Sequence, residues 1–278
     1  MTKGPSDLIQ RYIATVKAAI LNDLYPEAEA ERAYLIDVAE GAKPFDAKVF
    51  YSGAAADPET LAKISETRQT GRHLDGRLKY ITIGASMVGR ARLDNLQHAI
   101  ETVLTENIQG DILECGVWRG GASAFAKTIL AAHGSDRAVW LADSFEGLPP
   151  PERPEDDIDL QAAKYPMLAI PQPKVQALFE RLGLMDDRVR FLKGWFNETL
   201  PDAPVETLAV LRLDGDYYES TITPLDALYD KVSPGGFIII DDYGLLEPAR
   251  RATEDFRTAR GITTPVIDID GIGVYWRK

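Results

Sequence analysis

The spacing of apolar residues predicts helices through the first part of the chain. Residues 7–22 place apolar side chains three and four positions apart, which is the spacing of one helix face. Asp57, which precedes a proline, is a typical helix start. Residues 94–107 form another amphipathic pattern, with Asp94 as the expected N-cap and a glutamine three positions later. We therefore expect residues 1–107 to form a helical extension, and a lid over a neighbouring domain.

The pattern changes after this point, because short apolar strands alternate with amphipathic helices from residue 108 to residue 278. The expected strands are 111–117, 138–142, 189–192, 207–213 and 236–240, and the expected helices are 121–133, 174–183, 222–232 and 247–260. This alternation is typical of an α/β fold, in which helices cover both faces of a mostly parallel sheet. Residues 265–269 and 273–276 predict a closing hairpin that adds an antiparallel strand.

Composition narrows the choice of partners. The chain has 45% hydrophobic and 27% charged residues, which is ordinary for a globular protein, and a formal net charge of -12. Nucleic acids and anionic membranes would be repelled by this charge, so we expect neither as a partner. No apolar run approaches the ~20 residues of a membrane helix, and the lone Cys115 forms no intrachain disulfide. We expect a soluble, cytoplasmic protein.

The segment after the first strand, ECGVWRGG, suits an amino-acid ligand. Its glycines allow a tight turn, and the helix that follows presents free N–H groups to a carboxylate. Glu114 stands before Gly116, the first of these glycines, where it would repel a phosphate and attract an ammonium group. A ligand with both groups is the methionine part of S-adenosylmethionine. The alternative is a tight turn without a ligand.

The next two strand ends offer groups for a nucleoside. Asp143 and Ser144 follow the second strand, where a carboxylate can bind both ribose hydroxyls. The alternative is a cap or a turn. Gly194, Trp195 and Phe196 follow the third strand, and an aromatic side chain here can cover an adenine ring or simply pack on the loop.

Four carboxylates follow the fourth and fifth strands. Asp214 and Asp216 belong to one strand end, and Asp241 and Asp242 to the other. Like charges so close would raise one another's pKa, and a hard divalent cation with oxygen ligands, such as Mg²⁺, Mn²⁺ or Ca²⁺, removes the conflict. The alternatives are helix caps or solvated acids. Either Asp214 or Asp216 can act as a general base for a hydroxyl, and the sequence does not divide these roles.

Four segments carry a likeness to a known family, and they are YITIGASMVGRAR (80–92), GDILECGVWRGGASAFA (110–126), LADSFEGLPPP (141–151) and LRLDGDYYESTITPLDALYDKVSPGGFIIIDDYG (211–244). From about residue 80 to its end, the sequence resembles the macrocin O-methyltransferase family. This family includes the sugar O-methyltransferases of macrolide and aminocoumarin antibiotic pathways. The long segment 211–244 is the most specific of the four.

The resemblance implies a class I methyltransferase fold, which is Rossmann-like with a seven-stranded sheet. It implies S-adenosylmethionine as methyl donor and Mg²⁺ (or Mn²⁺) held by Asp214, Asp241 and Asp242, with Asp214 also as the family's proposed base. The donor-binding positions that it implies are Met87, Val88, Glu114, Gly116, Ser123, Asp143, Ser144, Gly194, Trp195 and Phe196.

The expected function is methyl transfer to a hydroxyl of a small-molecule acceptor, most simply a sugar of a glycosylated natural product or a nucleotide sugar. Alternatives are a phenolic or other non-sugar hydroxyl, or a protein that binds the donor and has lost catalysis. Family members commonly form dimers or larger assemblies, so we expect a homo-oligomer. The proline-rich residues 149–173 and the N-terminal helices are candidates for a lid that excludes water.

Overall fold

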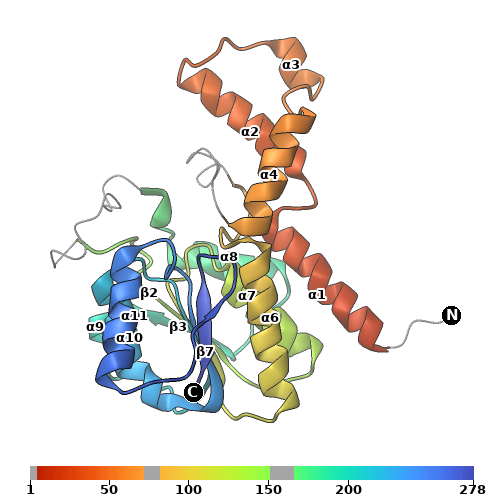
Figure 1. Ribbon diagram of the computed structural model, residues 1–278. Helices are drawn as coiled ribbons and strands as arrows, with labels where there is room; N and C mark the ends of the chain where they lie inside the picture. Colours follow the sequence, from red (N-terminus) through yellow and green to blue (C-terminus); the bar gives the residue numbers. More distant parts are fainter. Residues whose placement is uncertain (1–4, 72–81, 151–165) are drawn as a thin grey trace. The chain divides into compact units, whose positions relative to one another are not determined.

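A computed structural model describes residues 5–71, 82–150 and 166–278 (Figure 1). The chain divides into two compact units, Met1–Leu93 (unit 1) and Asp94–Lys278 (unit 2), and helix α6 (Gly89–Thr105) runs across their boundary. Most of the proline-rich insertion, and the start of the 80–92 segment, lie outside the described residues.

Unit 2 is built on a seven-stranded sheet with the order β3-β2-β1-β4-β5-β7-β6. The strands are β1 (Asp111–Cys115), β2 (Val139–Asp143), β3 (Val189–Lys193), β4 (Leu208–Leu213), β5 (Val232–Ile240), β6 (Ile267–Asp268) and β7 (Val274–Arg277). Strands β1 to β5 are parallel, whereas β7 is antiparallel to β5 and β6 to β7. The predicted mostly parallel sheet with a closing hairpin is confirmed.

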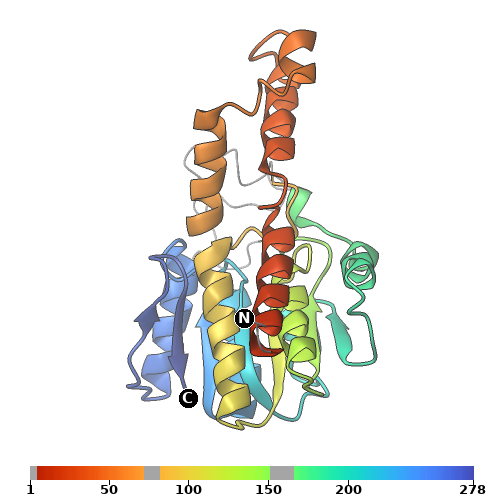
Figure 2. The ribbon, with the colours of Figure 1, turned by 90° about the vertical axis from the view of Figure 1, so that its right-hand side faces the viewer.

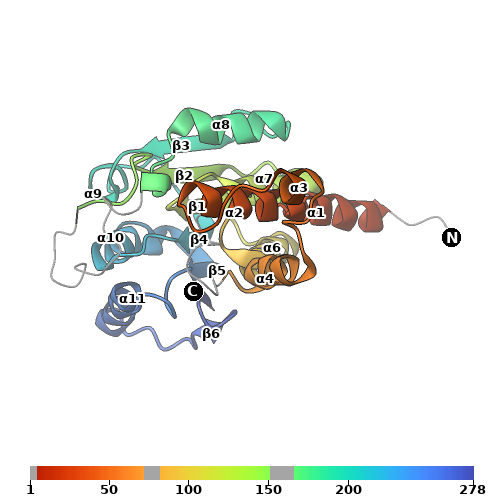
Figure 3. The same cartoon turned by 90° about the horizontal axis from the view of Figure 1, so that it is seen from above.

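Helices cover both faces of this sheet, as the alternating pattern predicts (Figures 1 and 3). One face carries α6, α7 (Gly121–Ala132) and α8 (Gln172–Arg181). The other carries α9 (Phe196–Thr199), α10 (Tyr218–Leu228) and α11 (Glu247–Ala259), and short 3₁₀ turns lie at Pro166–Leu168 and Tyr229–Lys231. The hydrophobic core under α9 to α11 includes Leu113, Leu213, Ile240, Leu225 and Phe256.

The register of the strands places charged side chains together on the face of α6 and α7. Glu114 of β1 lies opposite Arg212 of β4, which in turn lies opposite Ile239 of β5. Side chains two positions apart share a face of a sheet, so Asp214 and Asp241 continue the rows of Arg212 and Ile239 on the same face. Strand order reverses between β1 and β4, which is where such sheets bind ligands.

Unit 1 is helical (Figure 2). Its helices are α1 (Pro5–Leu21), α2 (Pro26–Ala39), α3 (Ala47–Tyr51) and α4 (Pro58–Thr70). The predicted cap at Asp57 is confirmed, because its carboxylate accepts hydrogen bonds of 2.9 Å from the amides of Glu59 and Thr60.

The predicted cap at Asp94 is wrong, because α6 begins at Gly89 and Asp94 lies inside it. Leu93 is fully buried, as are the later apolar positions Leu96 and Ile100, and it extends the helical spacing upstream of Asp94. No glycine or proline interrupts residues 90–93, so the helix continues through the polar residue that resembles a cap.

Candidate active site

Backbone hydrogen bonds continue past the ends of the central strands and hold these ends together. The amide of Asp214 donates to the carbonyl of Cys115 at 2.9 Å, and the amide of Asp241 donates to Leu213 at 2.8 Å. Gly116 in the same way donates to Ala142 at 2.9 Å. The residues that follow β1, β2, β4 and β5 therefore meet at one edge of the sheet.

Three of the predicted acids form a compact cluster at this edge. Asp214, Asp241 and Asp242 each offer a carboxylate oxygen, and these oxygens all lie within 4.8 Å of one another. Asp241 and Asp242 are buried, whereas the side chain of Asp214 is 26% exposed. The geometry brings together the three residues that the sequence marks as metal ligands, and leaves one of them accessible to a small molecule.

Asp216, the second candidate base, lies against the same cluster. Its amide donates to a carboxylate oxygen of Asp242 at 3.3 Å. Its φ is 65°, a left-handed conformation that few residues other than glycine adopt. Unusual backbone conformations gather at functional sites, where the surrounding structure holds them in place.

Arg212 occupies the centre of the site and was not predicted from the sequence. Its Nη1 donates to an oxygen of Glu114 at 2.5 Å and to one of Asp214 at 3.0 Å, while its Nη2 donates to Asp241. The side chain is 3% exposed. A signal was present, since Arg212 is the one charged residue in the apolar strand LAVLRL. Most of the predicted site residues follow strands, whereas Arg212 lies inside a strand.

Burial and charge act against each other in this network. Burial raises the pKa of Glu114 to about 7, although Arg212 and the hydroxyl of Ser123, which donates to Glu114, both favour the carboxylate. Burial also opposes the charge of Arg212, but Asp241, Asp214 and Glu114 together raise the pKa of its guanidinium above the ordinary value. Among the described residues, one guanidinium thus pairs with the three carboxylates of Glu114, Asp214 and Asp241, and Asp242 lies beside the last two.

Asp143 organises the ends of β1 to β3. One of its carboxylate oxygens accepts hydrogen bonds from the amides of Val117 at 2.6 Å and Trp118 at 3.3 Å, and the other accepts from Phe145 at 2.6 Å. Its backbone carbonyl accepts from Gly194 at 3.0 Å, which joins the end of β3 to that of β2. Burial raises the pKa of Asp143, and these amides oppose the shift. The neighbouring Ser144 hydroxyl donates to the carbonyl of Gly147 at 3.0 Å.

Gly116 makes the close approach of β1 and β4 possible. Its φ is 84°, and a Cβ at this position would lie 1.7 Å from the carbonyl oxygen of Asp214. Helix α7 begins shortly afterwards, and among the described residues no side chain caps its first turn. Free N–H groups and the positive end of a helix dipole are therefore presented beside the carboxylates.

The other predicted donor-binding residues occupy three places. Trp195 is the N-cap residue of α9, and Phe196 packs against the hydrophobic core of unit 2. Ser123 is buried in α7. Met87 and Val88 belong to unit 1, where the amide of Val88 donates to the hydroxyl of Ser86 at 3.3 Å.

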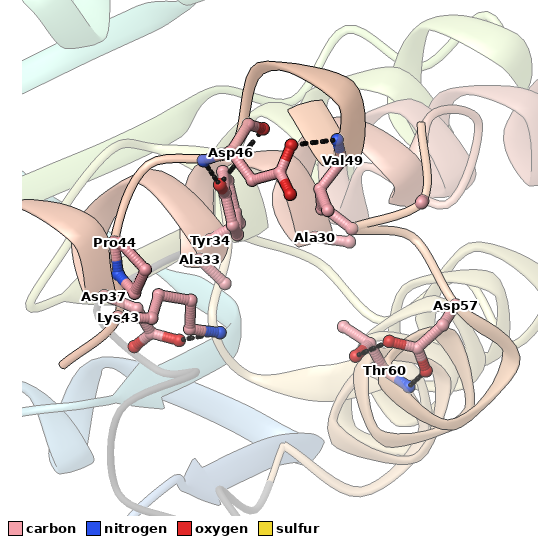
Figure 4. Close-up of a pocket in the computed structure, with 12 residues that line it drawn as sticks. Ala30, Ala33, Tyr34, Asp37, Lys43, Pro44, Asp46, Val49, Asp57 and Thr60 are labelled. Carbon is pink, nitrogen blue, oxygen red and sulfur yellow. Dashed lines mark hydrogen bonds and ion pairs between the residues drawn. The ribbon is translucent and has the colours of Figure 1, made fainter. Parts of the chain in front are cut away.

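Unit 1 contains a cavity of about 350 Å³ between α2, α3 and α4 (Figure 4). Lys43 forms an ion pair of 2.8 Å with Asp37, and the hydroxyl of Tyr34 accepts the amide of Asp46 at 2.6 Å. The carboxylates of Asp46 and Asp57 cap α3 and α4. These acids thus serve the helices of unit 1, in contrast to the acids at the strand ends of unit 2.

Comparison with known proteins decides the family. The model of the macrocin O-methyltransferase (TylF) family matches residues 9–278. The chain belongs to this family. The resemblance is therefore confirmed, and with it the prediction of an O-methyltransferase, since this is a family of enzymes.

Relatives of known activity lie in the same family. The chain is 41% identical over 281 residues to the 8-demethyl-8-(2,3-dimethoxy-alpha-L-rhamnosyl)-tetracenomycin-C 4'-O-methyltransferase of Streptomyces olivaceus, with 100% of this chain and 95% of the relative covered. It is 38% identical to the mycinamicin III 3''-O-methyltransferase of Micromonospora griseorubida, with 99% of both chains covered. It is 45% identical over 197 residues to the demethyldecarbamoylnovobiocin O-methyltransferase of Streptomyces niveus, which covers 69% of this chain and 75% of the relative.

Solved structures confirm the fold. The structure of the O-methyltransferase NovP superposes with a TM-score of 0.78 and 34% identity, covering 97% of this chain and 99% of that one. The calicheamicin methyltransferase CalS11, at 17% identity and a TM-score of 0.55, shares the fold. Family and fold together support S-adenosylmethionine as the methyl donor. Among the residues that the structure describes, no helix is both long and apolar enough to cross a membrane.

Proposed function

We propose that this protein transfers a methyl group from S-adenosylmethionine to a sugar hydroxyl of a glycosylated natural product or nucleotide sugar, with Mg²⁺ or Mn²⁺ held at the strand ends, in the biosynthesis of an antibiotic. The observation that carries the proposal is the convergence of Glu114, Asp143 and the Asp214–Asp241–Asp242 cluster at one edge of the sheet. The relatives support the sugar, because the name of the first specifies a rhamnosyl-bearing acceptor.

The ends of β1 to β3 fit the methyl donor. S-adenosylmethionine, when bound, supplies an electrophilic methyl group on a sulfonium. Gly116 leaves space where any side chain would meet the backbone of Asp214, and the uncapped first turn of α7 suits a carboxylate. Glu114 is the acid for the ammonium group, and Asp143 is the acid for the ribose. Gly194, Trp195 and Phe196 would contact the adenine, and Met87, Val88, Ser123 and Ser144 complete the proposed set.

The acid cluster fits a hard divalent cation. All three proposed ligands are carboxylates, and their oxygens lie close enough to share one ion. Among the described residues, three carboxylates share the one guanidinium of Arg212, which is a reason for a further cation to bind beside them. Such an ion would orient the acceptor hydroxyl and lower its pKa.

The residues of the chain then have separate tasks. Asp214 is half-buried and accessible, so one of its oxygens can accept the proton of the acceptor hydroxyl. Asp216 is the second candidate for this proton, since its backbone is fixed against Asp242. Asp241 and Asp242 are buried and hold their positions through Arg212 and the amide of Asp216. Placing the hydroxyl in line with the methyl group removes a large part of the barrier.

Calorimetry and turnover test the proposal together. We expect S-adenosylmethionine to bind with one site per chain, and Mg²⁺ to bind in a way that EDTA reverses. Turnover, followed by release of S-adenosylhomocysteine, is expected with glycosylated natural products or nucleotide sugars and not with simple phenols. An absence of donor binding at millimolar concentration would overturn the proposal, and turnover confined to phenols would overturn the sugar acceptor.

Three expectations about assembly and organisation stay predictions. A homo-oligomer, the absence of a nucleic-acid partner, and a helical lid formed by residues 1–107 on a donor-binding domain of residues 108–278 can each be measured directly. Sedimentation at several protein concentrations measures the oligomeric state. A nucleic-acid binding assay at low salt tests the expected absence of a nucleic-acid partner. Removal of the N-terminal helices would tell whether they close over the donor.

A further inference from the structure

One guanidinium contacts both halves of the proposed site. The Nη1 of Arg212 donates to Glu114, the proposed ammonium-binding acid, and to Asp214, a proposed metal ligand. Its Nη2 donates to Asp241, a second proposed ligand. These three acids come from three adjacent strands, β1, β4 and β5. Arg212 therefore contacts acids of both the proposed donor site and the proposed metal site.

Two of the three proposed metal ligands accept hydrogen bonds from Arg212. Asp214 and Asp241 each use one carboxylate oxygen for this contact, and a carboxylate has two oxygens with about four lone-pair sites, so this hydrogen bond is compatible with metal ligation. A planar guanidinium fixes the directions of its hydrogen bonds, so it fixes the orientation of the carboxylates that accept them. Outer partners of this kind orient metal ligands in many proteins.

We propose that Arg212 is a positioning residue that sets the orientation of Glu114 for the methyl donor and of Asp214 and Asp241 for the metal, so that both sites depend on one side chain. This inference rests on the proposed function. The inference goes beyond the proposed function because it assigns the orientation of both sites to Arg212, a residue outside the proposed set of donor-binding and metal-binding residues.

A role in charge balance alone makes a different prediction. Arg212 is a cation beside a proposed cation site, so its charge repels Mg²⁺. If the charge were all that mattered, Arg212→Lys would leave both affinities unchanged and Arg212→Gln would tighten Mg²⁺ binding. If Arg212 positions the carboxylates, both variants weaken Mg²⁺ binding, because a lysine ammonium is a point charge and cannot reproduce the planar fork that reaches Glu114 and Asp241 together.

The experiment is calorimetric titration of the full chain, in the wild type and in Arg212→Lys, with Mg²⁺ alone and with S-adenosylhomocysteine alone. We expect Arg212→Lys to weaken both affinities by about tenfold. Arg277→Lys is the matched control, because Arg277 also lies on a strand and pairs with a carboxylate, Glu106, but it lies opposite Phe237 of β5 and away from the strand end at Ile240. We expect both affinities to stay within twofold of wild type in this control, a margin that calorimetry resolves.

Three outcomes have distinct meanings. A wild-type chain that binds neither ligand overturns the proposed function, and this inference with it. A wild-type chain that binds both, with Arg212→Lys unchanged in both affinities and lower only in thermal midpoint, leaves the proposed function standing and shows that Arg212 is merely structural. Loss of one affinity alone overturns the dependence of both sites on Arg212.

A measurement on the wild type covers the case in which Arg212→Lys does not fold. The Mg²⁺ affinity is titrated with and without saturating S-adenosylhomocysteine. Because one guanidinium contacts acids of both sites, we expect the two Mg²⁺ affinities to differ by at least about threefold. Equal affinities would contradict a shared positioning residue.

Discussion

The two units of this protein each contain a buried arginine among carboxylates, and the two networks differ in the ratio of acids to arginines among the described residues. In unit 1, Arg68 pairs with Glu29 and lies 3.5 Å from Asp23, which also pairs with Arg90. In the described part of unit 1, these two acids pair with two arginines. In the described part of unit 2, Arg212 pairs with three acids, Glu114, Asp214 and Asp241, and Asp242 adds a carboxylate beside the last two.

Charge balance distinguishes a structural network from a binding site. Glu29 also accepts hydrogen bonds from the hydroxyl of Thr82 at 2.9 Å and the amide of Ile83 at 3.0 Å, so its carboxylate serves the fold of unit 1. Among the described residues of unit 2, the carboxylates of the Arg212 network outnumber its one guanidinium. Carboxylates without a matching cation do not stabilise a fold, but they can bind a cationic ligand. Breaking each network should therefore change a different property.

The largest effect is expected from Asp241→Ala. Loss of this acid removes a proposed metal ligand and a partner of Arg212. We expect turnover to fall by a factor on the order of 10³ or more. Donor binding, titrated without added metal, should stay within about threefold of wild type. Asp230→Ala is the control, because Asp230 pairs with Arg260 at the surface. Turnover by Asp241→Ala at the wild-type rate would contradict the assignment of Asp241 as a metal ligand.

Gly116→Ala tests the backbone of the same site. The added Cβ would collide with the carbonyl of Asp214 at a position with φ of 84°. We expect a loss of more than about 3 kcal/mol in unfolding free energy, together with loss of donor binding. Gly134→Ala is the control, since Gly134 also has positive φ, 65°, with nothing within 4 Å. It should lose about 1 kcal/mol, from backbone strain alone. Denaturant unfolding measures both, and equal losses would show that the close approach is unimportant.

Glu29→Gln breaks the network of unit 1. The substitution keeps the shape of the side chain and removes the charge that pairs with Arg68. We expect unfolding free energy to fall by about 2 kcal/mol, because a buried arginine loses its main partner. The Mg²⁺ affinity should not change. A weaker Mg²⁺ affinity with unchanged stability would reverse the roles that we assign to the two networks.

The smallest effect is expected at Asp57, a cap of unit 1. Hydrogen bonds from Thr60 hold the pKa of this exposed carboxyl below its usual value of 3.8. A lowered folded-state pKa means that the carboxylate stabilises α4 above that value, and that this contribution is lost as the pH falls through the lowered pKa. Asp57→Ala should thus lower the thermal midpoint by a few degrees at pH 7 and by less near pH 2. A difference that grows on acidification would contradict the cap.

The sequence predicted the sheet, its closing hairpin and the acids at its edge for a simple reason. Residues that follow parallel strands meet at one edge, so Asp214, Asp241 and Asp242 could be placed together without a structure. Arg212 was not predicted, because its role depends on which side chains the strand register places beside it. Only the pairing of Glu114 with Arg212, and of β4 with β5, shows that one side chain spans three strands.

The ends of the helices were harder to predict from the sequence than the helices themselves. Asp57 and Asp94 both resemble caps, but only Asp57 follows a break in the apolar spacing, whereas Leu93 continues that spacing ahead of Asp94. The cavity between α2, α3 and α4 was not predicted, because it depends on how the three helices pack. Local patterns define the elements, and packing decides what lies between them.

The central claim is that a methyl-donor site and a metal site lie side by side at the ends of β1, β4 and β5. The most direct test is nuclear relaxation of the methyl protons of bound S-adenosylmethionine on addition of Mn²⁺, which can replace Mg²⁺ on carboxylate ligands. We predict strong relaxation in the wild type and its loss in Asp241→Ala. If the donor and Mn²⁺ both bind and the methyl protons are not relaxed, the two sites are not adjacent and the account is wrong.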